Sequence, residues 1–236
     1  IMIETCKNYC VLKVFDIDAD VLSKCRKIAA IDGVSLDFKQ QNLDCKLTLV
    51  NKSASDIEFQ RILDLILDAL GDNVYANYDT TLEQCVIENA RNKGAKIAVA
   101  ESLTGGMICS RLVDVSGSSS VLYEGFVTYD VSSKVRRLHV KLATIEEHGV
   151  VSEEVAREMA QGLLQNNEID LAIATTGCAG PLSDEYDTPV GLSYIAIGNR
   201  YGIEVYDTFF DKDRNDIRKS VTNTALYLAL KNIKEL

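Results

Sequence analysis

Three side chains in one short stretch of the sequence could together carry out acyl transfer. Ser119 lies in a serine-rich turn, Lys134 follows fifteen residues later, and Tyr129 lies between them. A serine attacks a carbonyl carbon when a base removes its proton, and a lysine can be that base only in its neutral form. Its pKa must then fall from about 10.4 to roughly 7 or 8, a shift that burial can cause. The spacing alone favours a simpler interpretation, a polar turn and a solvated lysine.

Two apolar runs, residues 97–100 and 171–175, are each followed by a glycine-rich turn with hydroxyl or thiol side chains. In open α/β sheets ligands bind beyond the carboxyl ends of the strands, so the two turns could share one pocket. The first turn leads into an amphipathic stretch of helical spacing, which would direct a helix N-terminus at an anion. This predicts a phosphate cradle at the first turn. Tight backbone geometry is the alternative explanation for either turn.

Four other side chains are weaker candidates. Cys178 lies in the second glycine turn, but no histidine close in the sequence could activate it as a nucleophile. His139 and His148 are more commonly surface or core residues than catalysts. Arg214 lies just inside a predicted helix start, where it could bind a phosphate or remain solvated.

These residues belong to a region in which helices alternate with buried strands. The alternation predicts a layered α/β sheet over residues 80–236. Besides the two apolar runs, strands are predicted at residues 190–197 and 203–210, and helices are predicted to begin after Ser152 and Asp213.

Residues 1–79 are predicted to form a separate, small α+β domain. A strand at residues 9–16 precedes an amphipathic helix, and residues 43–50 alternate as in a half-buried strand. Ser55 and Glu58 form a capping box at the start of a second apolar helix. The region contains no cluster of acid, base or nucleophile that would indicate chemistry.

The bulk composition narrows the functional class. The chain of 236 residues has a formal net charge of −10, which argues against nucleic-acid binding because that requires a basic surface. No stretch reaches the roughly 18 apolar residues of a membrane helix, and we expect no signal peptide. The seven cysteines are scattered without a Cys-x-x-Cys pair. We expect buried, reduced thiols, no metal site and a cytoplasmic compartment.

Several short motifs follow one another through the second region. They are Ala100–Gly106, Gly117–Ser119, Gly125–Tyr129, His148–Ser152, Gly177–Pro181, Pro189–Gly191 and Asp213–Arg214. In this order they resemble the CinA family, specifically its C-terminal nicotinamide-nucleotide amidase (PncC-type) domain, over about residues 80–235. The preceding region looks like the family's small middle domain, which is described as KH-like. The molybdopterin-binding-like N-terminal domain of full-length members has no counterpart in this sequence.

The resemblance implies hydrolysis of the carboxamide of nicotinamide mononucleotide to nicotinate mononucleotide and ammonia. It assigns Ser119 as the nucleophile, Lys134 as the base and Tyr129 as the residue that positions the base or relays the proton. It implies no cofactor, a homodimer, and a small-molecule substrate rather than nucleic acid or membrane as the partner. The substrate-binding residues that it implies are Ser102, Thr104, Gly105, Gly106, Gly177, Ala179, Gly180, Pro181 and, for the phosphate, Arg214.

Three departures from the family pattern concern the substrate. An acidic loop, residues 182–187, replaces a Gly-Gly-Ser-type segment, Lys212 replaces a glycine, and Leu103 stands where cysteine is common. The altered loop, together with the missing counterpart of the N-terminal domain, motivates an alternative, a catalytically inactive protein that binds pyridine nucleotides or serves a competence- or damage-linked interaction. An amidase for a related amide is a third possibility.

Overall fold

The computed structural model describes residues 8–30 and 33–236. The chain divides into two compact units, Ile1–Leu82 and Glu83–Leu236, each with its own sheet. This division falls a few residues after position 79, where the sequence analysis places the domain boundary.

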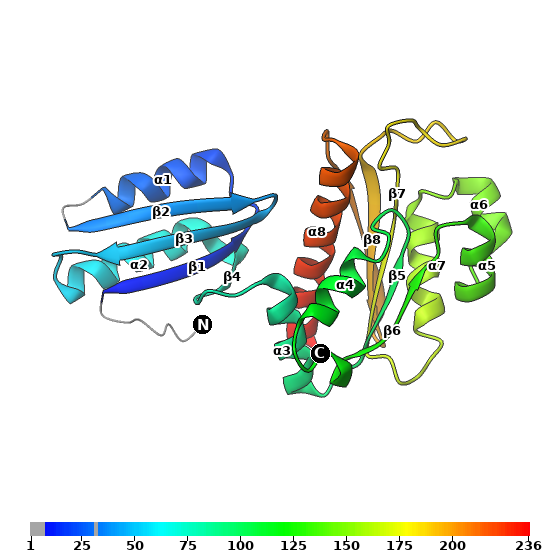
Figure 1. Cartoon of the computed structure of the whole chain (residues 1–236), viewed down its shortest axis with the longest axis horizontal. Coiled ribbons are helices and arrows are strands. Elements are labelled where there is room, and N and C mark those ends of the chain that lie inside the picture. Colours follow the sequence, from blue (N-terminus) through cyan, green and yellow to red (C-terminus); the bar gives the residue numbers. More distant parts are fainter. Residues whose placement is uncertain (1–7, 31–32) are drawn as a thin grey trace. The chain divides into compact units, whose positions relative to one another are not determined.

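The first unit is a four-stranded antiparallel sheet with two helices (Figure 1). Its elements alternate as strand, helix, strand, strand, helix and strand, and the sheet order is β2-β3-β1-β4. This is the split βαβ connectivity of ferredoxin-like domains, so the small α+β domain expected from the sequence has a definite topology. The elements are β1 (Tyr9–Phe15), α1 (Ala19–Ala29), β2 (Val34–Gln41), β3 (Asp44–Asn51), α2 (Asp56–Leu70), the 3-10 turn η1 (Gly71–Asn73) and β4 (Val74–Ala76).

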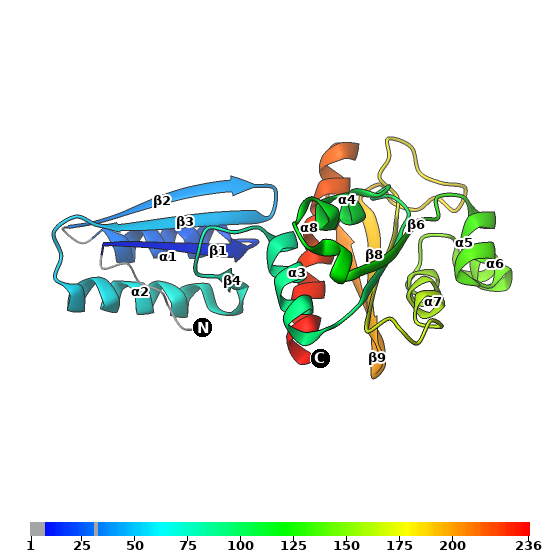
Figure 2. The ribbon, with the colours of Figure 1, turned by 60° about the horizontal axis from the view of Figure 1, so that its bottom comes forward.

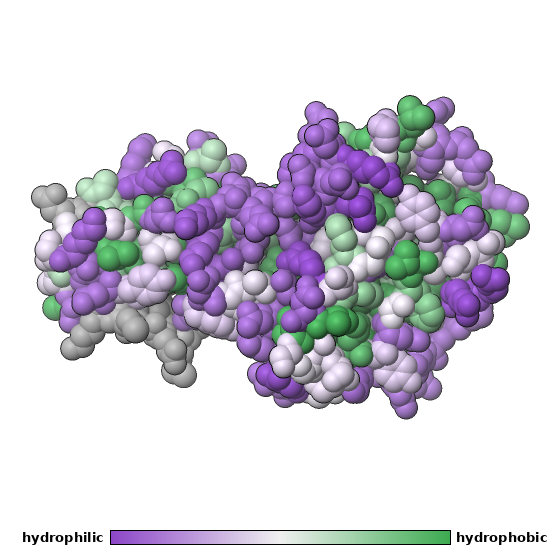
Figure 3. Space-filling view, viewed as in Figure 1, coloured by the Kyte–Doolittle hydropathy of each residue, from purple (hydrophilic) through white to green (hydrophobic). Residues whose placement is uncertain are grey.

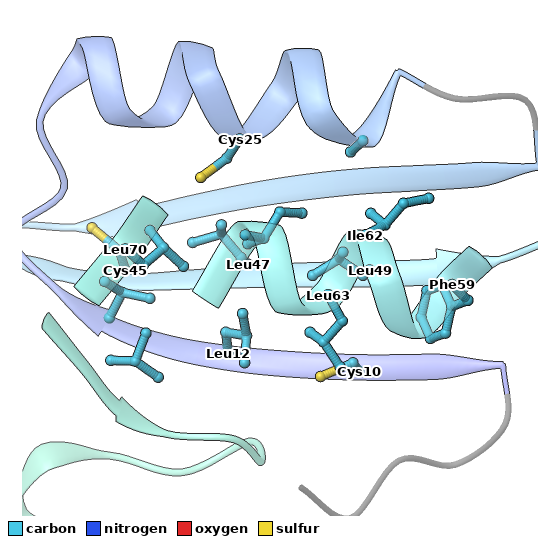
Figure 4. Packing of buried hydrophobic residues seen from close by; sticks show 14 residues of the cluster. Cys10, Leu12, Cys25, Cys45, Leu47, Leu49, Phe59, Ile62, Leu63 and Leu70 are labelled. Carbon is cyan, nitrogen blue, oxygen red and sulfur yellow. The ribbon is translucent and has the colours of Figure 1, made fainter. Parts of the chain in front are cut away.

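The core of the first unit lies between one face of the sheet and the two helices (Figure 4). Leu12 and Leu47 come from neighbouring strands, Leu63 comes from α2, and all three are fully buried. α2 begins after Ser55, whose Oγ accepts a hydrogen bond from the N–H of Glu58 at 3.2 Å. This half of the predicted capping box therefore forms.

The second unit contains a five-stranded sheet in the order β6-β5-β7-β8-β9. β5 pairs in parallel with β6 and with β7, whereas β8 and β9 continue the sheet with antiparallel pairing. Because β5, β6 and β7 run in the same direction, the turns that follow them all lie at one edge of the sheet. The strands are β5 (Ile97–Glu101), β6 (Leu122–Val127), β7 (Leu171–Gly177), β8 (Leu192–Asn199) and β9 (Gly202–Phe209).

Helices cover both faces of this sheet, as the alternating pattern predicts (Figures 1 and 2). α7 packs on one face and contacts α5 and α6, while α8 packs on the other face and contacts α4. α7 begins after Ser152, whose Oγ accepts the N–H of Val155 at 3.3 Å, which satisfies one of the free donors at the helix start. The helices are α3 (Leu82–Lys93), α4 (Met107–Asp114), the 3-10 turn η2 (Ser118–Ser120), α5 (Val131–Leu138), α6 (Leu142–His148), α7 (Glu153–Leu163) and α8 (Arg214–Glu235).

The surface of each unit is mostly hydrophilic on the face shown in Figure 3, with apolar side chains scattered among the polar ones. Within residues 8–30 and 33–236, no helix combines the length and apolar character that crossing a bilayer requires. Five of the six described cysteines are buried and Cys109 is partly exposed, while Cys6 lies outside the described residues.

Candidate active site

Lys134 is a fully buried lysine on α5, just beyond the end of β6. Its Nζ donates hydrogen bonds to the main-chain oxygen of Thr128 at 2.6 Å and to that of Tyr129 at 3.3 Å. A third bond, of 3.1 Å, joins it to the Oγ of Ser102. The amine thus contacts a serine hydroxyl while two backbone carbonyls hold it in place.

Burial lowers the pKa of Lys134 from 10.5 to about 8, because the ammonium group loses its hydration, and the negative charge of Asp130 offsets only part of this effect. None of the ion pairs in the described part of the chain includes Lys134. With this pKa, part of the lysine population is neutral near pH 7, which is the condition that a catalytic base must meet.

Glu101, the last residue of β5, bonds to the start of α4, whereas the next residue, Ser102, bonds to Lys134. Glu101 is fully buried, and its carboxylate accepts the N–H groups of Gly106 at 2.9 Å, Ile108 at 3.2 Å and Cys109 at 2.9 Å. These donors form the start of α4, so an internal carboxylate already occupies this helix N-terminus. The prediction of a phosphate cradle at this turn is therefore wrong.

Ser119 does not pair with Lys134. It lies exposed in η2, directly before β6, whereas Lys134 follows β6. The residues after η2 adjoin the start of β5, since the N–H of Ile97 bonds to the oxygen of Val121 at 2.9 Å. Ser102 follows the other end of β5, about 16 Å away for a strand that rises 3.3 Å per residue. The structure therefore pairs Lys134 with Ser102 and not with Ser119, which the resemblance implied as the nucleophile.

Tyr129 holds Lys134 through its main-chain oxygen, while its hydroxyl accepts a hydrogen bond from Nη2 of Arg214 at 3.1 Å. The other terminal nitrogen of Arg214 donates to the main-chain oxygen of Gly180. Tyr129 thus contacts the lysine through its main chain, whereas its hydroxyl is linked to the arginine. Arg214 in turn joins the turn after β6 to the turn after β7.

A cavity of about 300 Å³ opens beside Ser102 and Lys134. Its walls come from the turns that follow β5, β6 and β7 and from the start of α8, so these turns share one pocket as predicted. Seven residues proposed from the sequence line this cavity: Ser102, Tyr129, Lys134, Gly177, Ala179, Gly180 and Arg214.

Thr104, Gly105, Gly106 and Pro181, also proposed to bind substrate, are not among the residues that line the cavity. The Oγ1 of Thr104 is buried and hydrogen-bonded to that of Thr175 at 2.9 Å. Gly105 and Gly106 have φ values of 61° and 93°, a conformation that glycine adopts without strain. They make the tight turn between β5 and α4, which is a structural role.

Among the other weak candidates, Cys178 lies at the cavity and the two histidines do not. Cys178 is buried and lines the cavity, where its Sγ contacts the main-chain oxygen of Leu182 at 3.6 Å. His139 ends α5 in a left-handed conformation, and His148 lies 3.8 Å from the carboxylate of Glu154. Neither histidine lines the cavity, so neither is placed to activate the cysteine.

Several cavity residues have no catalytic signature in the sequence: most are apolar or belong to the acidic loop, and Thr176 is a strand residue of β7. Lys212, which departs from the family pattern, lies outside the cavity wall and bonds to Ser220 at 3.2 Å. Leu103, which also departs from that pattern, does line the cavity. The cavity residues that sequence reasoning did not assign to the site are Leu103, Val150, Val151, Thr176, Leu182, Ser183 and Asp184.

The fold and the site define a class of α/β protein in which a buried lysine and a serine face a cavity beyond the carboxyl ends of parallel strands. Residues 79–233 match the protein family described as CinA C-terminal domain. The chain belongs to the CinA family.

Relatives and solved structures agree with this assignment. The chain is 41% identical over 188 residues to a CinA-like protein of Chlorobaculum tepidum, covering 77% of this chain and 44% of that protein. It is 36% identical over 210 residues to a CinA-like protein of Syntrophomonas wolfei, covering 88% and 48%. The crystal structure of the competence/damage inducible protein CihA from Agrobacterium tumefaciens matches with a TM-score of 0.60 and 34% identity, covering 66% of this chain and 99% of that one. The chain thus spans about half the length of the curated relatives it matches.

Proposed function

We propose that the second unit is an amidase that hydrolyses the carboxamide of nicotinamide mononucleotide, with Ser102 as the nucleophile and Lys134 as the base. One observation carries this proposal: the buried Nζ of Lys134 lies 3.1 Å from the Oγ of Ser102. Burying a lysine without an ion pair is costly, so its retention beside a hydroxyl and a cavity favours a role in proton transfer.

In the proposed acylation step, neutral Lys134 removes the proton of Ser102 while Oγ attacks the carboxamide carbon. The tetrahedral intermediate then collapses: the C–N bond breaks, and the lysine returns its proton to the departing nitrogen, which leaves as ammonia. The nicotinoyl group remains on Ser102 as an ester. Lys134 next takes a proton from water, and the hydroxide attacks this ester; the C–Oγ bond then breaks, Lys134 returns the proton to Oγ of Ser102, and nicotinate mononucleotide leaves.

Backbone donors are available for the oxyanion that forms in both steps. The N–H groups of Leu103, Ala179 and Gly180 have no acceptor among the described residues, and all three residues line the cavity. Leu103 directly follows the proposed nucleophile. Donors of this kind, fixed before reaction, stabilise the developing negative charge more than the ground-state carbonyl.

The rest of the cavity suits a pyridine nucleotide. Leu103, Val150 and Val151 supply apolar surface for a flat ring. Arg214 provides a guanidinium group that can bind a phosphate in bidentate fashion. The carboxamide end of the ligand would then lie at Ser102 and the phosphate end at Arg214.

Ammonia release from nicotinamide mononucleotide tests the proposal directly. We expect turnover by the wild-type chain, a loss of at least about a thousandfold in Ser102→Ala, and nearly unchanged turnover in the matched variant Ser119→Ala. Folded wild-type protein that binds the nucleotide without turnover would instead support the inactive binding protein. Turnover of another amide in its place would redirect the proposal to that substrate.

A further inference from the structure

Asp184 is the one acidic residue among the described residues that line the cavity. It belongs to the loop 182–187, and the other two acidic residues of this loop, Glu185 and Asp187, are exposed and do not line the cavity. A single carboxylate of the loop, rather than its overall negative charge, therefore borders the space for the ligand.

Hydrogen bonds fix the position of this carboxylate. Its Oδ1 accepts the N–H groups of Tyr186 at 3.1 Å and Thr188 at 3.0 Å, and its Oδ2 accepts the hydroxyl of Thr188 at 2.8 Å. Thr188 is buried, and the ring of Tyr186 packs so closely on Gly149 that an added Cβ there would lie 3.3 Å from it. Asp184 thus presents a charge held in place by the loop.

No cation neutralises Asp184 within the described residues, since none of their ion pairs includes it. Arg214, on the same cavity wall, bonds to a carbonyl and a tyrosine hydroxyl rather than to a carboxylate. The cavity therefore offers one unpaired anion and one unpaired guanidinium. Such a pair is electrostatically complementary to a ligand that carries both signs of charge.

We propose that Asp184 is a specificity-determining residue that recognises the positive charge of the pyridinium ring. This inference rests on the proposed function and deepens it. Nicotinamide mononucleotide carries a cationic ring and an anionic phosphate, and Arg214 serves the phosphate. Without Asp184 the ring would enter a cavity whose charged side chains, Arg214 and protonated Lys134, both repel it.

A pair of nucleotides that differ in ring charge tests this role. The reduced form, dihydronicotinamide mononucleotide, keeps the carboxamide, ribose and phosphate but has an uncharged ring. Both would be titrated calorimetrically into the full chain carrying Ser102→Ala, which prevents turnover. Adding Asp184→Asn removes the charge and retains a side-chain oxygen for the loop hydrogen bonds. Asp187→Asn, in the same loop but outside the cavity wall, is the matched control.

We expect Asp184→Asn to weaken binding of the oxidised nucleotide roughly tenfold and to change binding of the reduced one less than about twofold, with Asp187→Asn changing neither. Equal weakening of both nucleotides would overturn the inference, because the carboxylate would then act on a shared group or on the loop's structure. Unchanged binding of the oxidised nucleotide would overturn it as well.

The assay of ammonia release separates this inference from the proposed function. Suppose that the wild-type chain turns over nicotinamide mononucleotide, but Asp184→Asn weakens both nucleotides equally or leaves binding of the oxidised one unchanged. Only the role of Asp184 then fails. If the chain releases no ammonia but Asp184→Asn selectively weakens the charged nucleotide, only the catalytic proposal fails. If the wild-type chain releases no ammonia and Ser102→Ala binds neither nucleotide, both fail.

Discussion

The carboxylate of Glu101 accepts the N–H of Gly106 at 2.9 Å, while the hydroxyl of the next residue, Ser102, accepts a bond from Lys134 at 3.1 Å. Successive side chains of a strand point to opposite faces, and the end of β5 uses this alternation to separate a structural anion from the proposed nucleophile. By holding the start of α4, Glu101 also fixes the path of the loop that begins at Ser102.

Replacing Glu101 should therefore affect stability and activity together. In Glu101→Gln the side-chain amide offers one acceptor oxygen to three N–H donors, so we expect a loss of about 2 kcal/mol in the free energy of unfolding. Chemical denaturation measures it. Glu146→Gln, on the exposed surface of α6, is the control and should change stability by less than about 0.5 kcal/mol. Equal stabilities of the two variants would contradict the structural role of Glu101.

The pH dependence of turnover should report the titration of Lys134. Only the neutral amine can accept a proton, and burial places its pKa at about 8. We expect kcat/KM to rise with pH and to level off above pH about 8. A rate profile over this range, with buffer and ionic strength held constant, would show the ascending limb. A profile that is flat from pH 6 to about 9 would exclude a lysine base with this pKa.

Lys134 should also give the second unit a characteristic dependence of stability on pH. Its pKa is about 8 in the folded state against 10.5 as the unfolded reference, so between these values the unfolded chain binds more protons. The contribution of Lys134 to the free energy of unfolding is fully present above pH 10.5, and it is lost as the pH falls from that value through about 8. The loss approaches roughly 3–4 kcal/mol, at about 1.4 kcal/mol for each unit of pKa difference.

Lys134→Met removes this dependence, whatever it does to absolute stability. Denaturation at several pH values should show that wild-type stability increases relative to the variant as the pH rises from 8 toward 10.5. Parallel curves for the two proteins would mean that the lysine has an ordinary pKa in the folded state.

Arg214 should matter mainly for substrates that carry a phosphate. Arg214→Gln is expected to raise the KM for nicotinamide mononucleotide about tenfold or more, since a charge-assisted contact contributes roughly 1.5–3 kcal/mol. The KM for nicotinamide riboside, which lacks the phosphate, should stay within about twofold of the wild-type value. Arg200→Gln is the control, because Arg200 lies in the turn between β8 and β9 at the opposite edge of the sheet. An equal effect on both substrates would place the phosphate elsewhere.

Much of the fold follows from the sequence because its signals are local. The runs at residues 97–100 and 171–175 are uninterrupted apolar segments, apart from Thr175 at the end of the second, and both are strands. β4, residues Val74–Ala76, escaped prediction because three residues are too few to show a period. Its place in the sheet depends on pairing with β1, which is a long-range contact.

The misassignment of Ser119 has a topological cause. Ser119 is closer to Lys134 in the sequence than Ser102 is. However, β6 lies between Ser119 and Lys134, and this strand runs from one edge of the sheet to the opposite edge. Residues that follow parallel strands share an edge, and residues that precede them lie at the opposite edge. Ser102 and Lys134 both follow a strand of the parallel set, so the fold brings them to the same edge of the sheet although they are 32 residues apart in the sequence.

Other features of the site are beyond the reach of sequence reasoning. The contacts of Arg214 with Tyr129 and Gly180 join segments far apart in the chain. The carboxylate of Glu101 binds N–H groups whose availability depends on where α4 begins. Such contacts depend on the final path of the backbone, which motifs and periodicity do not specify.

The two carbonyl groups that hold the amine of Lys134 belong to Thr128 and Tyr129, and every amino acid supplies such a carbonyl. Substitution of Tyr129, which lines the cavity, can therefore alter the wall of the pocket and its preference for ligands without removing the carbonyl that holds the lysine. Ligand selectivity can therefore change between related sequences while the proposed proton acceptor, the amine of Lys134, keeps its position.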